Sequence, residues 1–236
     1  MQNTKLISHR GLSSEAPENT LASFRLACEA GTWGVECDIY ETADSHFVIT
    51  HDDTLTRMCG VDVCVKNQTL AEIQSHRIIA GNNVEYFPDE VMPSLDEYLK
   101  LLSQYSGIHP VIELKDDTLS AESLKRLADT VKEYFACSDV WFISFFGNLL
   151  LSLKTIEPEF HYQYLFVDAS EENLQFCIDN NMDADMLCLN VTEEIIRRLH
   201  AHDLKVNVWT VNKKESADYL SQTVEVDYIT SNYMFL

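Results

Sequence analysis

The chain has 236 residues, and its 38 acidic side chains outnumber its 17 basic ones to give a formal net charge of −21. This charge makes nucleic acid and anionic membrane surfaces unfavourable partners, because like charges repel. The longest uninterrupted apolar run is four residues, as at 140–143. No segment therefore approaches the roughly 20 apolar residues of a membrane-spanning helix.

The composition favours one folded domain over residues 1–236. Hydrophobic residues make up 46% of the chain, enough for a sizeable core at this length. The first residues run into a strand-like segment without the apolar stretch of a signal peptide, so we expect a cytoplasmic protein. The seven cysteines are odd in number and scattered, which indicates reduced thiols.

Eight short β-rich runs alternate with helical patterns along the chain. In chain order, the expected strands are 6–9, 34–40, 110–114, 140–145, 161–166, 186–189, 206–211 and 227–230. The clearest helical pattern follows the third strand, where Leu124, Leu127 and Val131 share one face. A capping box at Ser94 predicts another helix start, and Asn19 and Thr192 are further expected N-caps.

Eight strands separated by helices predict an α/β fold of the (β/α)₈ barrel type. An open, doubly wound sheet also alternates strands with helices, so the pattern leaves that alternative open. Two irregularities interrupt the alternation. The weakly periodic stretch 52–93 is too long for an ordinary loop and predicts an insertion after the second strand. Only six residues follow the eighth strand, so the last barrel helix is expected to be missing or reduced.

Ionisable side chains gather where the expected strands end, which is the active-site end of such a barrel. Glu36 and Asp38 are two residues apart and should leave the same face of the second strand, and Glu113 follows on the third. Three carboxylates without a thiolate favour a hard cation, Mg²⁺ or Ca²⁺. The alternative is a structural salt bridge of these carboxylates with Arg10 or Lys115.

The other candidate site residues lie at the same strand ends. His9 and His51 could supply a base and an acid, since an unperturbed imidazole titrates near neutral pH. Arg10 and Lys115 suit phosphate oxygens. Trp209 lies in the seventh expected strand, where it is either core or an apolar wall of a substrate pocket.

Together these residues form a pattern that resembles the glycerophosphodiester phosphodiesterase family. The elements that carry the resemblance are His9-Arg10-Gly11, Pro17-Glu18-Asn19-Thr20, Glu36-x-Asp38, Thr42-x-Asp44, His51-Asp52, Glu113-x-Lys115 and Trp209-Thr210. They occur in order and nearly from end to end of the chain. The resemblance implies a barrel with a small insertion after the second strand, and metal-dependent hydrolysis of glycerophosphodiesters to glycerol 3-phosphate and an alcohol.

Carried over position by position, the resemblance gives each residue a role. It implies Glu36, Asp38 and Glu113 as ligands of a divalent cation, His9 and His51 as the acid/base pair, and Arg10 and Lys115 as phosphate contacts. It also implies that the substrate's own glycerol hydroxyl is the nucleophile, through a cyclic phosphate.

The carboxyl end departs from the family pattern. Thr230 is followed by Ser231 and Asn232, where family members continue with Thr-Asp-x-Pro and a final helix. This puts the closure of the barrel at its eighth strand in doubt.

Two other functions stay open. One is a lysophospholipase D-like phosphodiesterase, with Val84, Tyr86, Phe87, Val91 and Met92 of the insertion as walls of a lipid-sized mouth. The other is a non-catalytic barrel that binds a phosphorylated ligand, although the catalytic set is complete. The sequence does not decide which histidine is the base.

Overall fold

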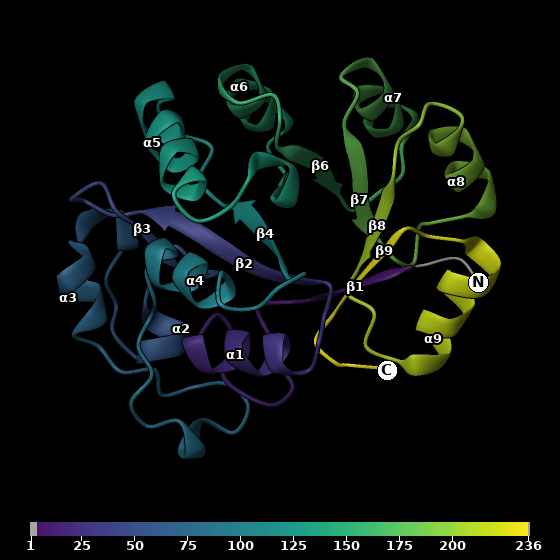
Figure 1. Cartoon of the computed structure of the whole chain (residues 1–236). Helices are drawn as coiled ribbons and strands as arrows, with labels where there is room; N and C mark the ends of the chain where they lie inside the picture. Colours follow the sequence, from purple (N-terminus) through teal and green to yellow (C-terminus); the bar gives the residue numbers. More distant parts are fainter. Residues whose placement is uncertain (1–3, 236) are drawn as a thin grey trace.

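The computed structural model describes residues 4–235, which form a closed barrel of eight parallel strands (Figure 1). The barrel strands are β1 (Lys5–Ser8), β2 (Gly34–Glu41), β4 (His109–Leu114), β5 (Trp141–Ser144), β6 (His161–Phe166), β7 (Asp183–Leu187), β8 (Val206–Trp209) and β9 (Tyr228–Ser231). Because β1 pairs with both β2 and β9, the sheet closes on itself. The predicted barrel is confirmed and the open sheet is excluded.

Helices cover the outside of the barrel (Figure 1). They are α1 (Leu21–Glu29), α4 (Leu95–Leu102), α5 (Ala121–Lys132), α6 (Gly147–Ile156), α7 (Glu171–Asp179), α8 (Glu193–His200) and α9 (Lys214–Tyr219). Their apolar faces pack on the strands, as in α5, where Leu124, Leu127 and Val131 are buried. No helix in residues 4–235 has the length and apolar character that crossing a membrane requires.

Most helix starts follow the expected capping chemistry. Ser94 caps α4 in a capping box with Glu97, and Thr192 caps α8. The expectation for Asn19 is wrong, because Thr20 is the residue that caps α1. Asn19 instead adopts a left-handed backbone conformation and turns its side chain toward the barrel.

The stretch 52–93 builds a small layer of its own beside α1 and α4. It follows β3 (Phe47–Ile49), which runs antiparallel to β2, and contains α2 (Thr56–Cys59), α3 (Leu70–Gln74) and the short turns η1 (Val65–Asn67) and η2 (Val84–Tyr86). Leu55, Ile73 and Met92 belong to a buried apolar cluster inside this layer. The insertion therefore has a small apolar core of its own.

The carboxyl end closes the barrel without a last helix. Strand β9 pairs with β1 over four residues and also with β8, which removes the doubt about closure. Among the described residues no helix follows β9, as the short tail predicts. Asn232 consequently comes directly after β9, beside the start of the loop that follows β1.

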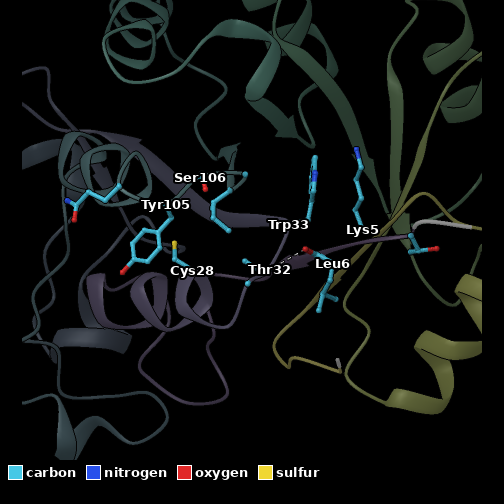
Figure 2. Close-up of a pocket in the computed structure, with 12 residues that line it drawn as sticks. Lys5, Leu6, Cys28, Thr32, Trp33, Tyr105 and Ser106 are labelled. Atoms are coloured by element: carbon cyan, nitrogen blue, oxygen red, sulfur yellow. Dashed lines mark hydrogen bonds between the residues drawn. The ribbon is translucent and has the colours of Figure 1, made fainter.

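Aromatic side chains close the other end of the barrel. Trp33, Trp141 and Tyr228 form a contiguous group there, with the Lys5 ammonium over the Trp33 ring. A cavity of about 690 Å³ lies at this end. Figure 2 shows side chains that line it, among them Lys5, Trp33 and Tyr105. None of the ionisable residues singled out from the sequence lines it, so the polar end of the barrel is the opposite one.

Candidate active site

A tight turn after β1 places His9 and Arg10 at the mouth of the barrel. Arg10 and Gly11 both have positive φ angles, 56° and 76°. A Cβ atom on Gly11 would lie 2.6 Å from the carbonyl carbon of Ser23 and 2.8 Å from the backbone nitrogen of Phe24, so only glycine fits this turn. The turn directs the Arg10 backbone N–H to Glu36 Oε2 at 2.7 Å.

The segment 17–20 holds the charged groups of the site in place. Glu18 Oε1 lies 2.8 Å from both Arg10 Nη1 and Arg57 Nη2. Asn19 Nδ2 donates to Asp38 Oδ2 at 2.7 Å. Each polar side chain of this motif therefore contacts another part of the site or starts the helix that follows.

Three buried carboxylates meet where β2 pairs with β4. Glu36, Asp38 and Glu113 are 1%, 0% and 8% exposed, and one oxygen of each lies within 4.8 Å of the others. The arrangement follows from strand geometry, because Glu36 and Asp38 share a face of β2 and Asp38 is in register with Glu113 on β4. The clustering expected from the sequence is present.

Two cations sit among these carboxylates. Lys115 Nζ lies 2.9 Å from Glu113 Oε1 and 3.4 Å from Asp38 Oδ1, and Arg10 Nε lies 3.3 Å from Asp38 Oδ2. The salt bridges considered as the alternative are thus present around Asp38. Two cations do not neutralise three carboxylates, however, and Glu36 Oε1 and Asp38 Oδ1 have no hydrogen-bond partner among the described residues.

Burial and neighbouring charges shift the pKa values of the carboxyl groups. Burial, reinforced by the charge of Asp38, raises the pKa of Glu36 and raises the pKa of Glu113 to about 8. Burial opposes ionisation of Asp38 as well, but Lys115 and Arg10 hold the pKa of that carboxyl below its ordinary value. The group offers carboxylate oxygens, some without a hydrogen-bond partner, and it contains no thiolate. Such a ligand set fits a hard divalent cation such as Mg²⁺ or Ca²⁺.

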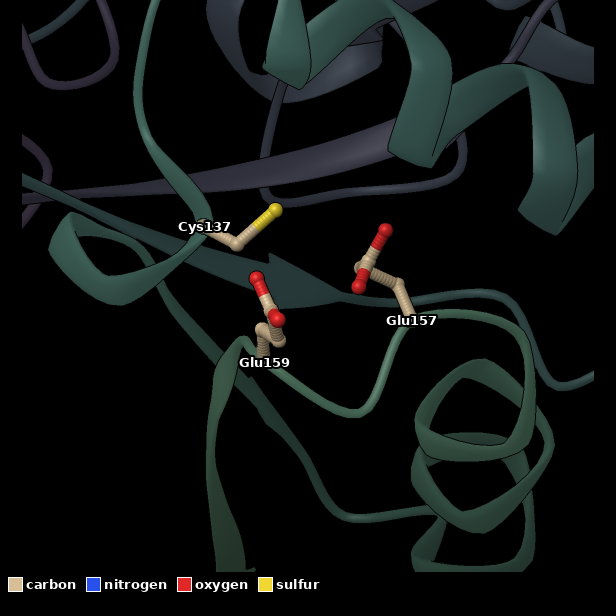
Figure 3. A group of neighbouring side chains, drawn as sticks. All are labelled: Cys137, Glu157 and Glu159. Carbon is tan, nitrogen blue, oxygen red and sulfur yellow. The ribbon is translucent and has the colours of Figure 1, made fainter.

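A second group of possible ligands, Cys137, Glu157 and Glu159, lies on the outside of the barrel (Figure 3). Glu157 Oε2 already pairs with Lys132 Nζ at 3.1 Å, and Glu159 is exposed. Burial raises the pKa of Cys137, which disfavours the thiolate that a metal would require. This group lacks the buried, uncompensated charge of the carboxylates at the barrel mouth.

The two histidines have different partners at Nδ1. His9 Nδ1 lies 2.7 Å from Asn232 Oδ1, which also accepts from Ser13 Oγ at 3.1 Å. His51, two residues beyond β3, has Asp52 Oδ1 at 2.8 Å from its Nδ1. Nε2 is the remaining nitrogen for proton transfer in both rings.

The surroundings of His9 determine its protonation. Burial and the charge of Arg10 lower the pKa of His9 to about 4, so His9 is neutral at neutral pH. Its Nδ1 carries the proton that the Asn232 amide oxygen accepts, which leaves the lone pair on Nε2. At His51 the Asp52 carboxylate accepts from Nδ1. Asp52 is itself held by Arg57 Nε at 2.6 Å.

A cavity of about 210 Å³ lies between the histidines and the carboxylates. Its lining includes seven of the eight residues singled out from the sequence: His9, Arg10, Glu36, His51, Glu113, Lys115 and Trp209. The eighth, Asp38, is fully buried and contacts Arg10 and Lys115. Trp209 lines the cavity and packs against Phe145, with ring centroids 5.6 Å apart.

The sequence reading missed two polar residues of the site. Asp185 lines the cavity from β7, but the expected strand 186–189 begins beyond it, whereas β7 starts at Asp183. The spacing of Asp183 and Asp185 repeats that of Glu36 and Asp38 and could have revealed it. Asn232 gives no local signal, because it meets His9 only through closure of the barrel.

The insertion contributes no apolar wall to this cavity. None of the five residues considered for a lipid-sized mouth is among the lining residues. Met92 is 2% exposed within the apolar cluster of the insertion, and Tyr86 is 75% exposed to solvent.

Comparisons with known proteins identify the family of this chain. Residues 9–235 match the sequence profile of the glycerophosphoryl diester phosphodiesterase family. The chain is 30% identical over 220 residues to a glycerophosphodiester phosphodiesterase of Caldanaerobacter subterraneus, covering 91% of this chain and 88% of the relative. A similar protein from Bacillus altitudinis is 27% identical, with 98% and 95% covered.

Solved structures show the same barrel. An Oleispira antarctica phosphodiesterase, determined in complex with the product sn-glycerol-3-phosphate, superposes with a TM-score of 0.89 at 28% identity. The match covers 97% of this chain and 93% of that one. The family resemblance read from the motifs is confirmed: the chain belongs to the glycerophosphoryl diester phosphodiesterase family and is an enzyme of that family.

Proposed function

We propose that this enzyme hydrolyses glycerophosphodiesters to glycerol 3-phosphate and an alcohol, in a reaction that requires a divalent cation and two histidines. The observation that carries the proposal is one small cavity lined by two histidines, two cations and two carboxylates of the buried group, whose third member, Asp38, lies next to it. The product bound to the Oleispira antarctica relative supports the substrate class.

The carboxylates and the cationic side chains have different roles in binding the phosphodiester. Glu36, Asp38 and Glu113 would hold the divalent cation, which when bound would offset negative charge on the phosphoryl oxygens. Arg10 and Lys115 would contact the same group, and Glu18 fixes the direction of the Arg10 guanidinium. Preorganised positive charge of this kind usually contributes more to the catalysis of phosphoryl transfer than any other effect.

One histidine acts as the base and the other as the acid. His9 is neutral with its lone pair on Nε2, so we assign it as the base that takes the proton of a glycerol hydroxyl. As that oxygen forms its bond to phosphorus, the bond to the alcohol breaks, and His51 gives the leaving oxygen its proton. Water then opens the cyclic phosphate with the two roles reversed. An intramolecular nucleophile explains the requirement for glycerol.

The two alternatives read from the sequence find less support. A lysophospholipid would need apolar walls for its acyl chain, and the insertion supplies none to the cavity. A non-catalytic barrel would have no need for two histidines oriented by separate Nδ1 partners. The cytoplasmic location and the single-domain organisation stay predictions.

The test is release of glycerol 3-phosphate from glycerophosphocholine, glycerophosphoethanolamine and glycerophosphoglycerol, with lysophosphatidylcholine as the competing substrate. We expect release from at least one glycerophosphodiester with Mg²⁺ or Ca²⁺ present and little turnover of the lysophospholipid. No release from any glycerophosphodiester would contradict the proposal, and faster turnover of lysophosphatidylcholine would favour the lysophospholipase D-like alternative.

A further inference from the structure

Asp185 is a buried carboxyl group to which the proposed mechanism gives no role. It is 1% exposed, and it lines the catalytic cavity from β7. Its Oδ1 atom has no hydrogen-bond partner among the described residues. Asp185 also lies outside the compact group formed by Glu36, Asp38 and Glu113. Buried polar groups are nearly always hydrogen-bonded, so an unpartnered oxygen facing a cavity points to a ligand.

The neighbouring polar side chains do not donate a hydrogen bond to Asp185 Oδ1. Asn207 Nδ2 donates to Thr230 Oγ1 at 3.1 Å and to Gln163 Oε1 at 3.3 Å, and Thr230 Oγ1 lies 3.2 Å from Asn207 Oδ1. These side chains form a bonded layer across the barrel interior beside Asp185. Burial, with the charge of Glu113 nearby, raises the pKa of Asp185, so a neutral carboxyl that both donates and accepts is favoured.

The cavity has two chemically different sides. One side carries the histidines, the cations and the carboxylates assigned to the phosphodiester. The other side is apolar, formed by Ile143, Phe145, Leu165 and Trp209, with Asp185 and Thr230 as its polar groups. A short polyol matches that second side, because its CH groups pack on apolar walls while its hydroxyl groups need partners.

The cavity has room for a glycerol unit. Its volume of about 210 Å³ equals roughly seven water molecules at about 30 Å³ each. We propose that Asp185 is a specificity-determining residue that hydrogen-bonds a hydroxyl group of the glycerol half of the substrate. This inference rests on the proposed function.

The experiment measures binding of sn-glycerol 3-phosphate and of n-propyl phosphate, which has the same phosphate and chain length but no hydroxyl groups. Calorimetric titrations in Mg²⁺ compare the wild type with Asp185→Ala and Asp185→Asn. Asp183→Asn is the matched control, since Asp183 is on the same strand and accepts from the Lys205 backbone N–H at 2.8 Å, away from the cavity.

We expect the wild type and Asp183→Asn to bind glycerol 3-phosphate at least about tenfold more tightly than propyl phosphate. Asp185→Ala should lose most of that preference while its affinity for propyl phosphate changes less than about twofold. Asp185→Asn keeps a donor and an acceptor and should retain most of the preference. Asp185→Ala should melt no lower than the wild type, because it removes an unpartnered buried carboxyl group.

Three results would overturn the inference: an unchanged preference in Asp185→Ala, an equal loss of affinity for both phosphates, or unfolding of that variant. The last two would show a structural or metal-binding role for Asp185. The proposed function fails separately, if the wild type releases no glycerol 3-phosphate from any glycerophosphodiester.

Discussion

Replacing Glu113 with glutamine should change how stability depends on pH in the metal-free enzyme. Glu113 is 8% exposed, and burial beside Asp38 raises its pKa to about 8, whereas a glutamate in the unfolded chain titrates near 4.3. Between these two values the folded state binds more protons than the unfolded state. The stabilising contribution of protonated Glu113 is therefore complete below about pH 4.3 and is lost as the pH rises through 8.

The magnitude follows from the pKa gap. One pKa unit corresponds to about 1.4 kcal/mol, so the free energy of unfolding should fall by about 2 kcal/mol between pH 6 and pH 8 from this group alone. Glu113→Gln removes the titration and with it this part of the slope. It also removes the ion pair with Lys115, which keeps its second carboxylate partner, Asp38, at 3.4 Å.

Urea denaturation in EDTA at pH 6, 7 and 8 measures this slope for the wild type and for Glu113→Gln. The wild type should lose stability over the interval and the variant should lose about 2 kcal/mol less. Adding Mg²⁺ or Ca²⁺ should stabilise the wild type more at pH 8 than at pH 6, because a metal ligand must be deprotonated, and should stabilise the variant little. Equal slopes for the two proteins in EDTA would refute the reasoning.

Three further predictions concern the catalytic residues and the turn that positions them. His9→Ala and His51→Ala should each lower kcat by about 100- to 10,000-fold and leave metal affinity unchanged, and near-normal turnover by both would end the acid/base assignment. Asp52→Asn should lower kcat less than His51→Ala, because it weakens the contact that orients the His51 ring at Nδ1 but leaves the ring in place; an unchanged kcat would show that the carboxylate does not position the ring. Gly11→Ala should destabilise the fold by at least about 2 kcal/mol in thermal denaturation, given the contacts its Cβ would make, and a neutral effect would contradict the strained turn.

The barrel and its carboxylate cluster could be predicted because local spacing determines both. Strands and helices alternate visibly in the apolar pattern, and the two-residue spacing of Glu36 and Asp38 puts both side chains on one face of β2. The roles of individual residues came from the family resemblance. The strand β7 was placed too late because two aspartates occupy inward positions, where a packed barrel would carry apolar residues.

Contacts across long sequence separations had no local signal. Asn232 orients His9 from 223 residues away, and that contact exists only because β9 pairs with β1 and no helix follows it among the described residues. Asn19 looked like a helix cap, since it precedes the helical pattern and has a capping side chain. Its amide nitrogen donates a hydrogen bond to Asp38 instead, and the neighbouring Thr20 is the N-cap of α1. A hydrogen bond to the buried carboxylate Asp38 therefore takes precedence over helix capping at Asn19.

The most direct test of the central claim is glycerol 3-phosphate release by enzyme stripped with EDTA and then titrated with Mg²⁺ or Ca²⁺. We predict no release from the stripped enzyme and recovery that saturates at one metal ion per chain, with no recovery when Glu36 is replaced by glutamine. Full activity in the stripped enzyme, or full recovery in Glu36→Gln, would contradict the assignment of Glu36, Asp38 and Glu113 as the groups that hold the cation.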